Sequence, residues 1–448
     1  MKAIRYGIIP LLVFAFWPHS AAAQWTAEKP GSDNIDVLGH VPLGTKLSVS
    51  DIEMEQELDR PYAYVGRMSL GQMVYGPGAE GPKGMDIINI ADPEHPKLIY
   101  EWRIDNEDLH FPLGGMDIKY FKWNDRYYVV QSLQFMGGPD ADLGAVVLDV
   151  TGLPDASTVK EAVRIRSDRP GGFHNIFVYK HSSGRVLLFA TTQGPSAYVY
   201  DLGMAVDGDV DNALVGEVPI PDDIPGRQDY IGYHDFYVGY HPDTGQDRFY
   251  GGGDGGYYVY NVTDVKNPEI AVTLTNIPAL TWGHTFTPSP DGRYAVGETE
   301  HQYSPLRIFD MKPALDGQTT NISNPISAWT ADWKHLSHNH EVRWPYVFVS
   351  GYLDGLQVFS LMDPHNPVTV AYYDTYLGAA NPGQMAMFNG AFGVDVRNED
   401  GLIVGSDMTT GFWTFRMDGF NGWNGADWGV PNISSVQNWD EGPQAGTH

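Results

Sequence analysis

The sequence predicts an all-β fold, a β-propeller of seven blades, and three observations lead to this prediction. A two-strand phrase recurs along the chain, the composition is rich in glycine (51 residues) and tyrosine (26 residues), and the last repeat lacks an outer strand that has a counterpart near the N-terminus. Frequent glycine and aromatic residues are typical of short strands joined by tight turns.

In the recurring phrase an alternating strand ends in Asp, Asn or Ser, a turn that often contains Asp-Pro or Asn-Pro follows, and a second short strand comes next. Copies lie at 85–104, 145–165, 197–220, 257–277, 306–311 and 356–376. A seventh copy begins at 412–419 without its second strand, and "DVLGHVPL" at 36–43 resembles the outer strand "ALVGEVPI" at 213–220. We expect 36–43 to close the last blade, because a closed ring leaves no exposed sheet edge.

Three regions follow from this pattern. Residues 1–23 have a basic start, a short apolar run and a small-residue end, which predict a secretory signal peptide and a periplasmic or secreted protein. Residues 24–419 form the propeller, and we expect the acidic, Trp/Gly-rich tail at 420–448 to lie on the surface. No second long apolar run predicts a membrane span.

Composition excludes several functions. The chain has no cysteine, which excludes disulfides and thiol chemistry, and its formal net charge of -28 opposes binding to nucleic acid or to an anionic membrane. We find no Ser-His-Asp signature, phosphate-binding loop or dinucleotide fingerprint, so triad and nucleotide chemistry are unsupported.

Histidines recur at the start of the innermost strand of four consecutive repeats. When the repeats are aligned, "FHNI", "YHDF", "GHTF" and "NHEV" place His174, His234, His284 and His340 at one position. Equivalent positions of a propeller face one another around its axis, so we expect four imidazoles at one mouth of the channel. Imidazole ligands suit a divalent transition metal such as Fe, Cu, Zn or Mn, and suit Ca or Mg poorly.

Acidic loops are expected at the same mouth, because the turns between the second and third strands emerge where the first strands begin. They carry the side chains Asp254, Glu298, Glu300, His301, Asp354 and Asp407. These residues could orient ligand imidazoles or act as a general base, and "TEHQ" makes Glu300 and His301 the candidate catalytic pair.

Two other interpretations stay open. In WD-repeat propellers, a Gly-His near the start of each blade hydrogen-bonds an Asp in a turn, and if the four histidines do the same they are structural. The second interpretation is that the four histidines align by chance. His338 precedes the predicted strand and could be a fifth ligand or a partner of one. The remaining histidines, at 110, 181, 241, 335 and 365, fall at loop or turn positions, where solvated side chains are the simpler expectation.

The phrase in which a strand is followed by "DPEHP" or "DPHNP" and a further strand resembles the LVIVD-repeat proteins, exported β-propellers of bacteria and archaea. This resemblance covers most of the mature chain and implies the fold without an activity. The four histidines also look architecturally similar to the metal arrangements of the carotenoid cleavage oxygenases and of the selenium-binding protein/methanethiol oxidase group. That resemblance implies His174, His234, His284 and His340 as ligands.

Two function classes therefore remain. The first is a metal-dependent enzyme acting on a small organic substrate, with an oxidoreductase ahead of a lyase or hydrolase because open positions beside imidazoles suit a redox-active metal. The second is a non-catalytic propeller of the cell envelope that binds a protein partner and has structural histidines.

Overall fold

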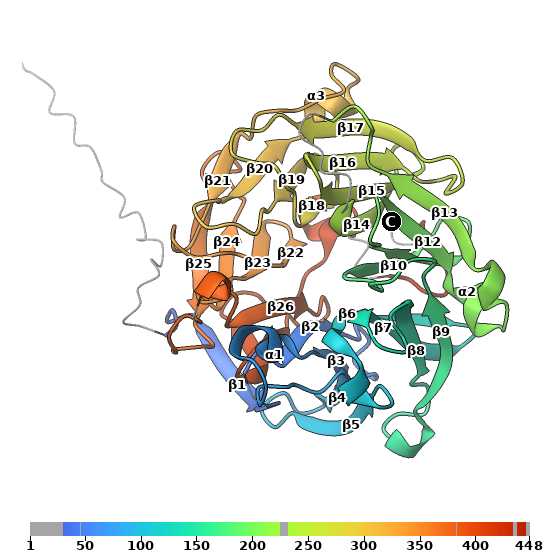
Figure 1. Cartoon of the computed structure of the whole chain (residues 1–448). Coiled ribbons are helices and arrows are strands. Elements are labelled where there is room, and N and C mark those ends of the chain that lie inside the picture. Colours follow the sequence, from blue (N-terminus) through green and yellow to red (C-terminus); the bar gives the residue numbers. More distant parts are fainter. Residues whose placement is uncertain (1–29, 45, 225–231, 382, 433–436, 445–448) are drawn as a thin grey trace, which may run out of the picture.

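The computed structural model describes residues 30–44, 46–224, 232–381, 383–432 and 437–444. Seven four-stranded antiparallel sheets stand in a ring around a central channel (Figure 1), which confirms the predicted seven-bladed propeller. The predicted signal peptide at 1–23 lies outside the described residues. In the part of the chain that is described, no helix is long and apolar enough to cross a membrane.

The first four blades follow one another along the chain, each running from its inner to its outer strand. Blade 1 consists of β2 (Val49–Met54), β3 (Tyr62–Arg67), β4 (Gly84–Asn89) and β5 (Lys97–Arg103). Blade 2 consists of β6 (Phe111–Trp123), β7 (Arg126–Gly137), β8 (Leu143–Asp149) and β9 (Lys160–Arg166). Blade 3 consists of β10 (Ile176–Lys180), β11 (Val186–Ala190), β12 (Ser196–Asp201) and β13 (Leu214–Pro219). Blade 4 consists of β14 (Tyr233–His241), β15 (Gln246–Gly253), β16 (Gly256–Asn261) and β17 (Glu269–Thr275).

The ring closes through the N-terminal strand. Blade 5 consists of β18 (Phe286–Pro288), β19 (Tyr294–Gly297), β20 (Leu306–Asp310) and β21 (Ser327–Trp329). Blade 6 consists of β22 (His340–Arg343), β23 (Tyr346–Ser350), β24 (Leu356–Ser360) and β25 (Val368–Tyr373). Blade 7 combines β26 (Ala391–Val396), β27 (Ile403–Asp407) and β28 (Gly411–Met417) with β1 (Ile35–Val41). β1 pairs antiparallel with β28, for example Val37 with Phe415, so the predicted closure is confirmed.

Helices are short and occupy connections. Those described are α1 (Leu70–Tyr75), α2 (Leu202–Val206), α3 (Lys312–Leu315) and the 3₁₀ turns η1 (Glu107–Leu109), η2 (Ala156–Thr158), η3 (Val210–Asn212), η4 (Gly383–Met385) and η5 (Gly425–Trp428). α1 lies between the second and third strands of blade 1, at the end of the channel where the inner strands begin. We call this end the upper mouth.

Packing between the blades explains the sequence pattern. All seven residues of β8 are buried, whereas the outer strand β17 begins with three exposed residues. Middle strands such as β8 bury both faces against neighbouring blades and read as nearly continuous apolar runs, while outer strands leave part of their length exposed. The arrangement makes a rigid frame whose inner strands all begin at the upper mouth.

The C-terminal tail packs onto the blades at several points. Trp423 and Trp439 are each 6% exposed, and Trp439 lies in the hydrophobic cluster of blades 1 to 3, with its ring centre 5.9 Å from that of Tyr120. Asp440 pairs with Lys122 of β6 at 2.7 Å. Trp428, by contrast, is 42% exposed. The tail we expected on the surface thus lies along the blades with two of its tryptophans inserted.

Candidate metal centre

The strand ladders define one equivalent position in every blade at the upper mouth. In blades 5 and 6, the amides of His284 and His338 donate to the carbonyls of Glu298 and Ser350, both at 2.9 Å. Two residues further on, the inner strands pair as Phe286 with Gly297 and His340 with Val349. His284 and His338 are therefore equivalent, and His340 lies one step deeper in the channel.

In the other blades, the equivalent position lies two residues before the paired inner-strand residue. These paired residues are Ile52, Ile118, Ile176, Phe236 and Val394. Around the ring, these seven residues, which we call the mouth ring, are Ser50, Met116, His174, His234, His284, His338 and Phe392. Four consecutive blades thus contribute histidine, and the other three contribute a hydroxyl and two large apolar side chains.

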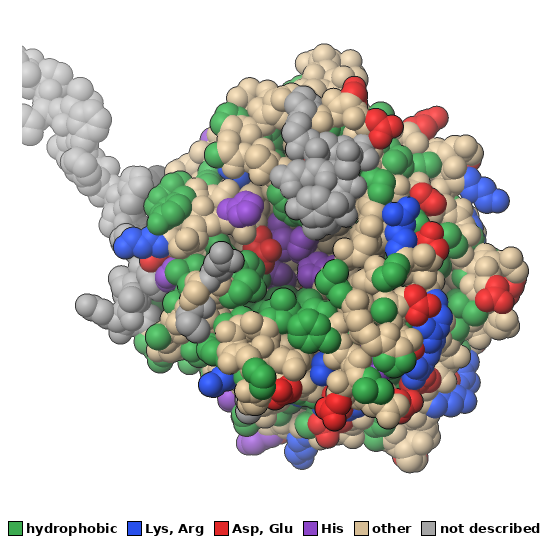
Figure 2. Space-filling view, in the orientation of Figure 1, with side chains coloured by type: hydrophobic (Ala, Val, Ile, Leu, Met, Phe, Trp, Pro, Cys, Tyr) green, Lys and Arg blue, Asp and Glu red, His purple; other side chains and the backbone are tan. Residues whose placement is uncertain are grey.

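The four imidazoles of the mouth ring touch in blade order. The ring centres of His174 and His234 are 4.6 Å apart, those of His234 and His284 are 4.0 Å apart, and those of His284 and His338 are 4.9 Å apart. Figure 2 shows purple histidine side chains at the bottom of a central hollow, with acidic side chains beside them. The histidines converge as the repeat alignment predicted, although His338 stands where we expected His340.

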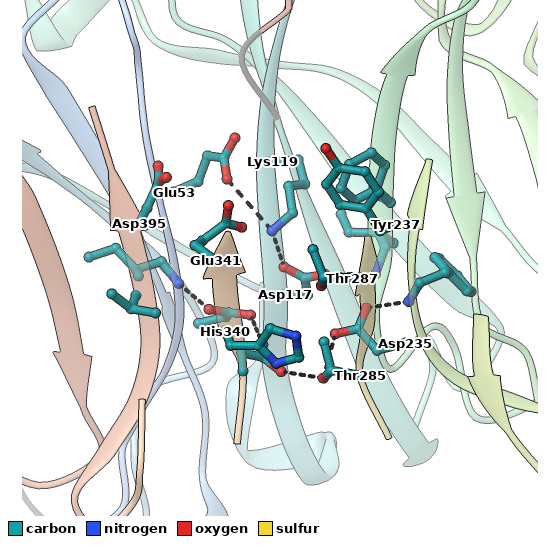
Figure 3. Close-up of a pocket in the computed structure, with 17 residues that line it drawn as sticks. Glu53, Asp117, Lys119, Asp235, Tyr237, Thr285, Thr287, His340, Glu341 and Asp395 are labelled. Atoms are coloured by element: carbon teal, nitrogen blue, oxygen red, sulfur yellow. Dashed lines mark hydrogen bonds and ion pairs between the residues drawn. The ribbon is translucent and has the colours of Figure 1, made fainter. Parts of the chain in front are cut away.

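His340, unlike the other predicted ligands, lies outside the mouth ring. It is the first residue of β22, 4% exposed, and it lines a small cavity beneath the mouth ring together with Thr285 and Asn339 (Figure 3). The structure therefore brings together His174, His234 and His284 but not His340. A shift of two residues leaves a side chain on the same face of a strand, so the alternation that located the strand cannot distinguish His338 from His340.

Three of the four imidazoles have an oxygen beside Nδ1. His174 Nδ1 lies 2.8 Å from Gln134 Oε1, His338 Nδ1 lies 2.6 Å from the Phe392 carbonyl oxygen, and His284 Nδ1 lies 2.7 Å from Glu298 Oε2. An acceptor at Nδ1 assigns the proton to that nitrogen and leaves the Nε2 lone pair free. The buried Nε2 of His284 has no hydrogen-bond partner among the described residues.

Glu298 occupies a position where most other blades have a small hydroxyl side chain. The equivalent residues in β7, in β27, after β11 and at the end of β23 are Ser132, Ser406, Thr191 and Ser350, whose hydroxyls bond the adjacent inner-strand backbone. Glu298 is 1% exposed, and burial together with the Glu300 charge raises its pKa well above the usual range. The sequence pattern predicts Glu298 in the acidic rim, but its contact with His284 could be identified only from the strand pairing.

Glu300 stands at the open side of the imidazoles. Its Oε2 is 3.5 Å from His284 Nε2, and its Oε1 accepts a hydrogen bond of 2.5 Å from the Tyr352 hydroxyl. Burial raises the pKa of Glu300 to about 7. His234, His284 and Glu300 each offer a ligand atom, and these three atoms lie within 4.8 Å of one another. Within the described ranges, this is the group of His, Cys, Asp and Glu side chains that could hold a metal.

The other rim residues have separate roles. His301 is exposed on the turn after Glu300. Asp354 lies 2.5 Å from His335 Nδ1, and Asp407 accepts hydrogen bonds from Thr375 and from the backbone of Thr409. The His335–Asp354 contact joins a loop histidine to an Asp in the following turn, which is the structural device expected from WD repeats. It occurs here outside the mouth ring.

Burial sets the protonation of the imidazoles. It lowers the pKa of His174 to about 4 and that of His338 to about 3, and it lowers the pKa values of His234 and His284 well below the usual range, with neighbouring imidazoles adding to the effect. Neutral imidazoles at pH 7 are the form that binds metal ions.

A polar cavity of about 50 Å³ lies below the mouth ring (Figure 3). Lys119 Nζ is 2.8 Å from Asp117 and 3.6 Å from Glu53, and the Thr285 hydroxyl contacts both His284 Nδ1 at 2.9 Å and Asn339 Oδ1 at 3.1 Å. Asn339 in turn donates to Asp51 at 2.8 Å. The floor of the imidazole cluster is therefore held by a hydrogen-bonded network.

No protein-family model matches the chain. No curated protein was found to be similar to it.

Proposed function

We propose that this protein is a metal-dependent enzyme whose metal is bound by the Nε2 atoms of His174, His284 and His338 and by a ring nitrogen of His234. The buried Nε2 of His284, which makes no hydrogen bond among the described residues although Glu300 Oε2 lies 3.5 Å away, is the observation that carries this proposal. A buried imidazole nitrogen without a partner is costly, and a metal ion would satisfy it together with its neighbours.

The donor set fits a transition metal. Two ligand atoms that share one ion at about 2.1 Å lie at most about 4.2 Å apart, so the ring nitrogens of His234 and His284, which lie within 4.8 Å of each other, need only a small contraction. Oxygen acceptors at the Nδ1 atoms of His174, His284 and His338 match the outer partners that orient metal-binding imidazoles. Fe, Cu, Zn and Mn all suit a set of several imidazoles.

Each residue around this site has a distinct task. The imidazoles bind the ion in their neutral form, and Glu298 orients the His284 ring. Glu300 faces the open side and can accept or return a proton at Oε2, while the Tyr352 hydroxyl holds Oε1. The metal would supply Lewis acidity and, if it is iron or copper, electron transfer.

Oxidoreductase chemistry remains our first assignment, because the imidazole-rich set leaves an open side toward the hollow and suits a redox-active metal. Glu300 beside His284 also supports a lyase or hydrolase, in which a carboxylate moves the substrate proton. His301 is exposed, so we assign the proton transfer to Glu300 alone.

A non-catalytic envelope propeller is the second candidate. Tyr303 and Trp333, which are 56% and 52% exposed, pair with ring centres 5.9 Å apart in the connections beside the upper mouth. Exposed aromatic pairs of this kind are common in protein interfaces. On either proposal we retain export to the periplasm or the medium, from the predicted signal peptide.

Metal analysis of the purified mature protein, before and after reconstitution, tests the enzyme proposal. We expect about one equivalent of a transition metal, lost when His234 and His284 are both changed to Ala. The scaffold candidate requires instead that the double variant has reduced thermal stability that is independent of metal. A protein that retains no transition metal after reconstitution would contradict the metalloenzyme proposal.

A further inference from the structure

The mouth ring has two chemically different halves. His174, His234, His284 and His338 occupy one half, and Met116, Phe392 and Ser50 occupy the other. The Ser50 hydroxyl is turned away into a hydrogen bond with the Gly115 carbonyl at 2.7 Å. The side chains that face the imidazoles across the channel are therefore a thioether and an aromatic ring.

This apolar half continues upward into a single cluster built from separate connections. Half-buried Val74 and Tyr75 of α1, Leu113 of β6, and Met385, Met387 and Phe388 before β26 pack against a buried group that includes Met116, Tyr352, Phe392 and Met408. We call this set the apolar wall. Figure 2 shows green hydrophobic side chains bordering the hollow beside the histidines, on the side of β26, α1 and β6.

The apolar wall also touches the polar half directly. The Phe392 ring lies 4.0 Å from that of His338, and the Tyr352 ring lies 5.1 Å from that of His338 and 5.4 Å from that of Phe388. Because the Tyr352 hydroxyl reaches Glu300, one side chain joins the wall to the carboxylate. A molecule against Phe388 and Tyr352 would have its polar end at Glu300 and the imidazoles.

Charge at the mouth disfavours an ionised ligand. None of the seven mouth-ring residues is Lys or Arg, and Glu298 and Glu300 both lie beside His284. In the metal-free protein, an anion would find no cationic partner in the ring and would lose its hydration against the apolar wall. Lys46 stands over the Tyr75 ring at 4.8 Å, but it is exposed to solvent, where its charge is screened. A cation would lose its hydration against the apolar wall.

We propose that the apolar wall is the substrate subsite and that the substrate is a neutral, apolar small molecule, an aromatic ring or branched alkyl group with one polar group directed at the imidazoles and Glu300. This inference rests on the proposed function for the role of the metal, but the wall would bind such a molecule whether or not metal is present. Apolar clefts with a few convergent polar groups are typical of small-molecule sites.

Calorimetric titration with 2-naphthol and with 2-naphthoate tests the inference, because the two probes share a ring system and differ in charge. We expect the full mature protein, freed of metal with a chelator, to bind 2-naphthol at least about tenfold more tightly than 2-naphthoate. Phe388→Asn should weaken 2-naphthol binding about tenfold, whereas Phe388→Leu should weaken it only slightly. Ile270→Asn, on the exposed outer strand β17, is the matched surface control and should leave binding unchanged.

The outcomes separate this inference from the metal proposal. In the metal-free protein, equal or tighter binding of 2-naphthoate, absence of 2-naphthol binding, or an unchanged affinity in Phe388→Asn would each overturn the apolar subsite. Absence of metal with normal 2-naphthol binding would instead overturn the proposed function and leave the subsite standing. Metal analysis of the same Phe388 variants should show wild-type stoichiometry, since Phe388 offers no ligand atom.

Discussion

Glu298 Oε2 lies 2.7 Å from His284 Nδ1, inside blade 5 and out of reach of solvent. The carboxylate comes from the segment after β19 and the imidazole from the segment before β18, which the sheet pairs side by side. This contact directs His284 Nε2 into the channel, where three further imidazoles and Glu300 meet it.

Exchanging this carboxylate for an amide should weaken metal binding without unfolding the protein. Glu298→Gln replaces the carboxyl group beside Nδ1 with an amide, and we expect an affinity about 10- to 100-fold lower in competition with a chelator. Glu53→Gln, which changes another buried carboxylate in the channel, is the control and should bind metal normally. Equal affinities for the two variants would remove Glu298 from the metal site.

The pair His338 and His340 allows a direct test of the ligand assignment. We expect His338→Ala to lose most of the bound metal, because its ring lies in the mouth ring, and His340→Phe to retain it, because phenylalanine occupies the equivalent position at Phe236 and Phe286. Metal content of the two purified variants, measured side by side, checks this. The reverse result would restore His340 as the ligand that the sequence alone suggested.

Asp51 should make the stability of the metal-free protein depend on pH. Burial raises its pKa to about 7, with Asp117 raising it further and Lys119, the Ile52 amide and Asn339 opposing the shift. The folded state therefore holds a proton that the unfolded chain releases near pH 4, so the stabilisation is complete below about pH 4 and is lost as the pH rises through about 7.

Urea unfolding at a series of pH values measures this effect against Asp51→Asn. The unfolding free energy of the wild type relative to the variant should fall between about pH 4 and about pH 7. Buried histidines such as His174, whose lowered pKa values give the opposite slope, are common to both proteins and cancel in the difference. A difference that stays constant over this range would show that Asp51 is ionised throughout.

The C-terminal tail should contribute to stability through one tryptophan and not through another. Trp439→Ala removes a side chain that is 6% exposed and packed near Tyr120, so we expect a loss of about 3 kcal/mol in the free energy of unfolding. Trp428→Ala, in the same tail but 42% exposed, should cost about 0.5 kcal/mol or less. Chemical denaturation of both variants measures this difference, and equal effects would mean that the tail is not anchored at Trp439.

Much of the architecture could be predicted from local patterns. The recurring strand phrase and the incomplete last repeat were enough to predict seven blades and their closure by 36–43, because each blade repeats the same strand and turn chemistry and a ring must pair its last edge. The convergence of His174, His234 and His284 followed from the same repeat.

Details of the site depended on how the strands pair. His338 lies two residues before His340, the first residue of β22, so a two-residue alternation does not distinguish them, and only the hydrogen bond from the His338 amide to Ser350 separates them. The motif "TEHQ" predicted that Glu300 and His301 form a catalytic pair. In the structure, the turn directs Glu300 toward His284 and leaves His301 exposed.

By itself, the sequence determined the repeat, the strand composition and the supply of imidazoles and carboxylates, since these depend on residues close together in the chain. Only the tertiary structure decided which imidazole completes the mouth ring, which carboxylate orients His284, and that the opposite half is apolar. Those relations join residues as distant as Met116 and Phe392, and they arise from strand register and blade packing, for which a single sequence holds no local signal.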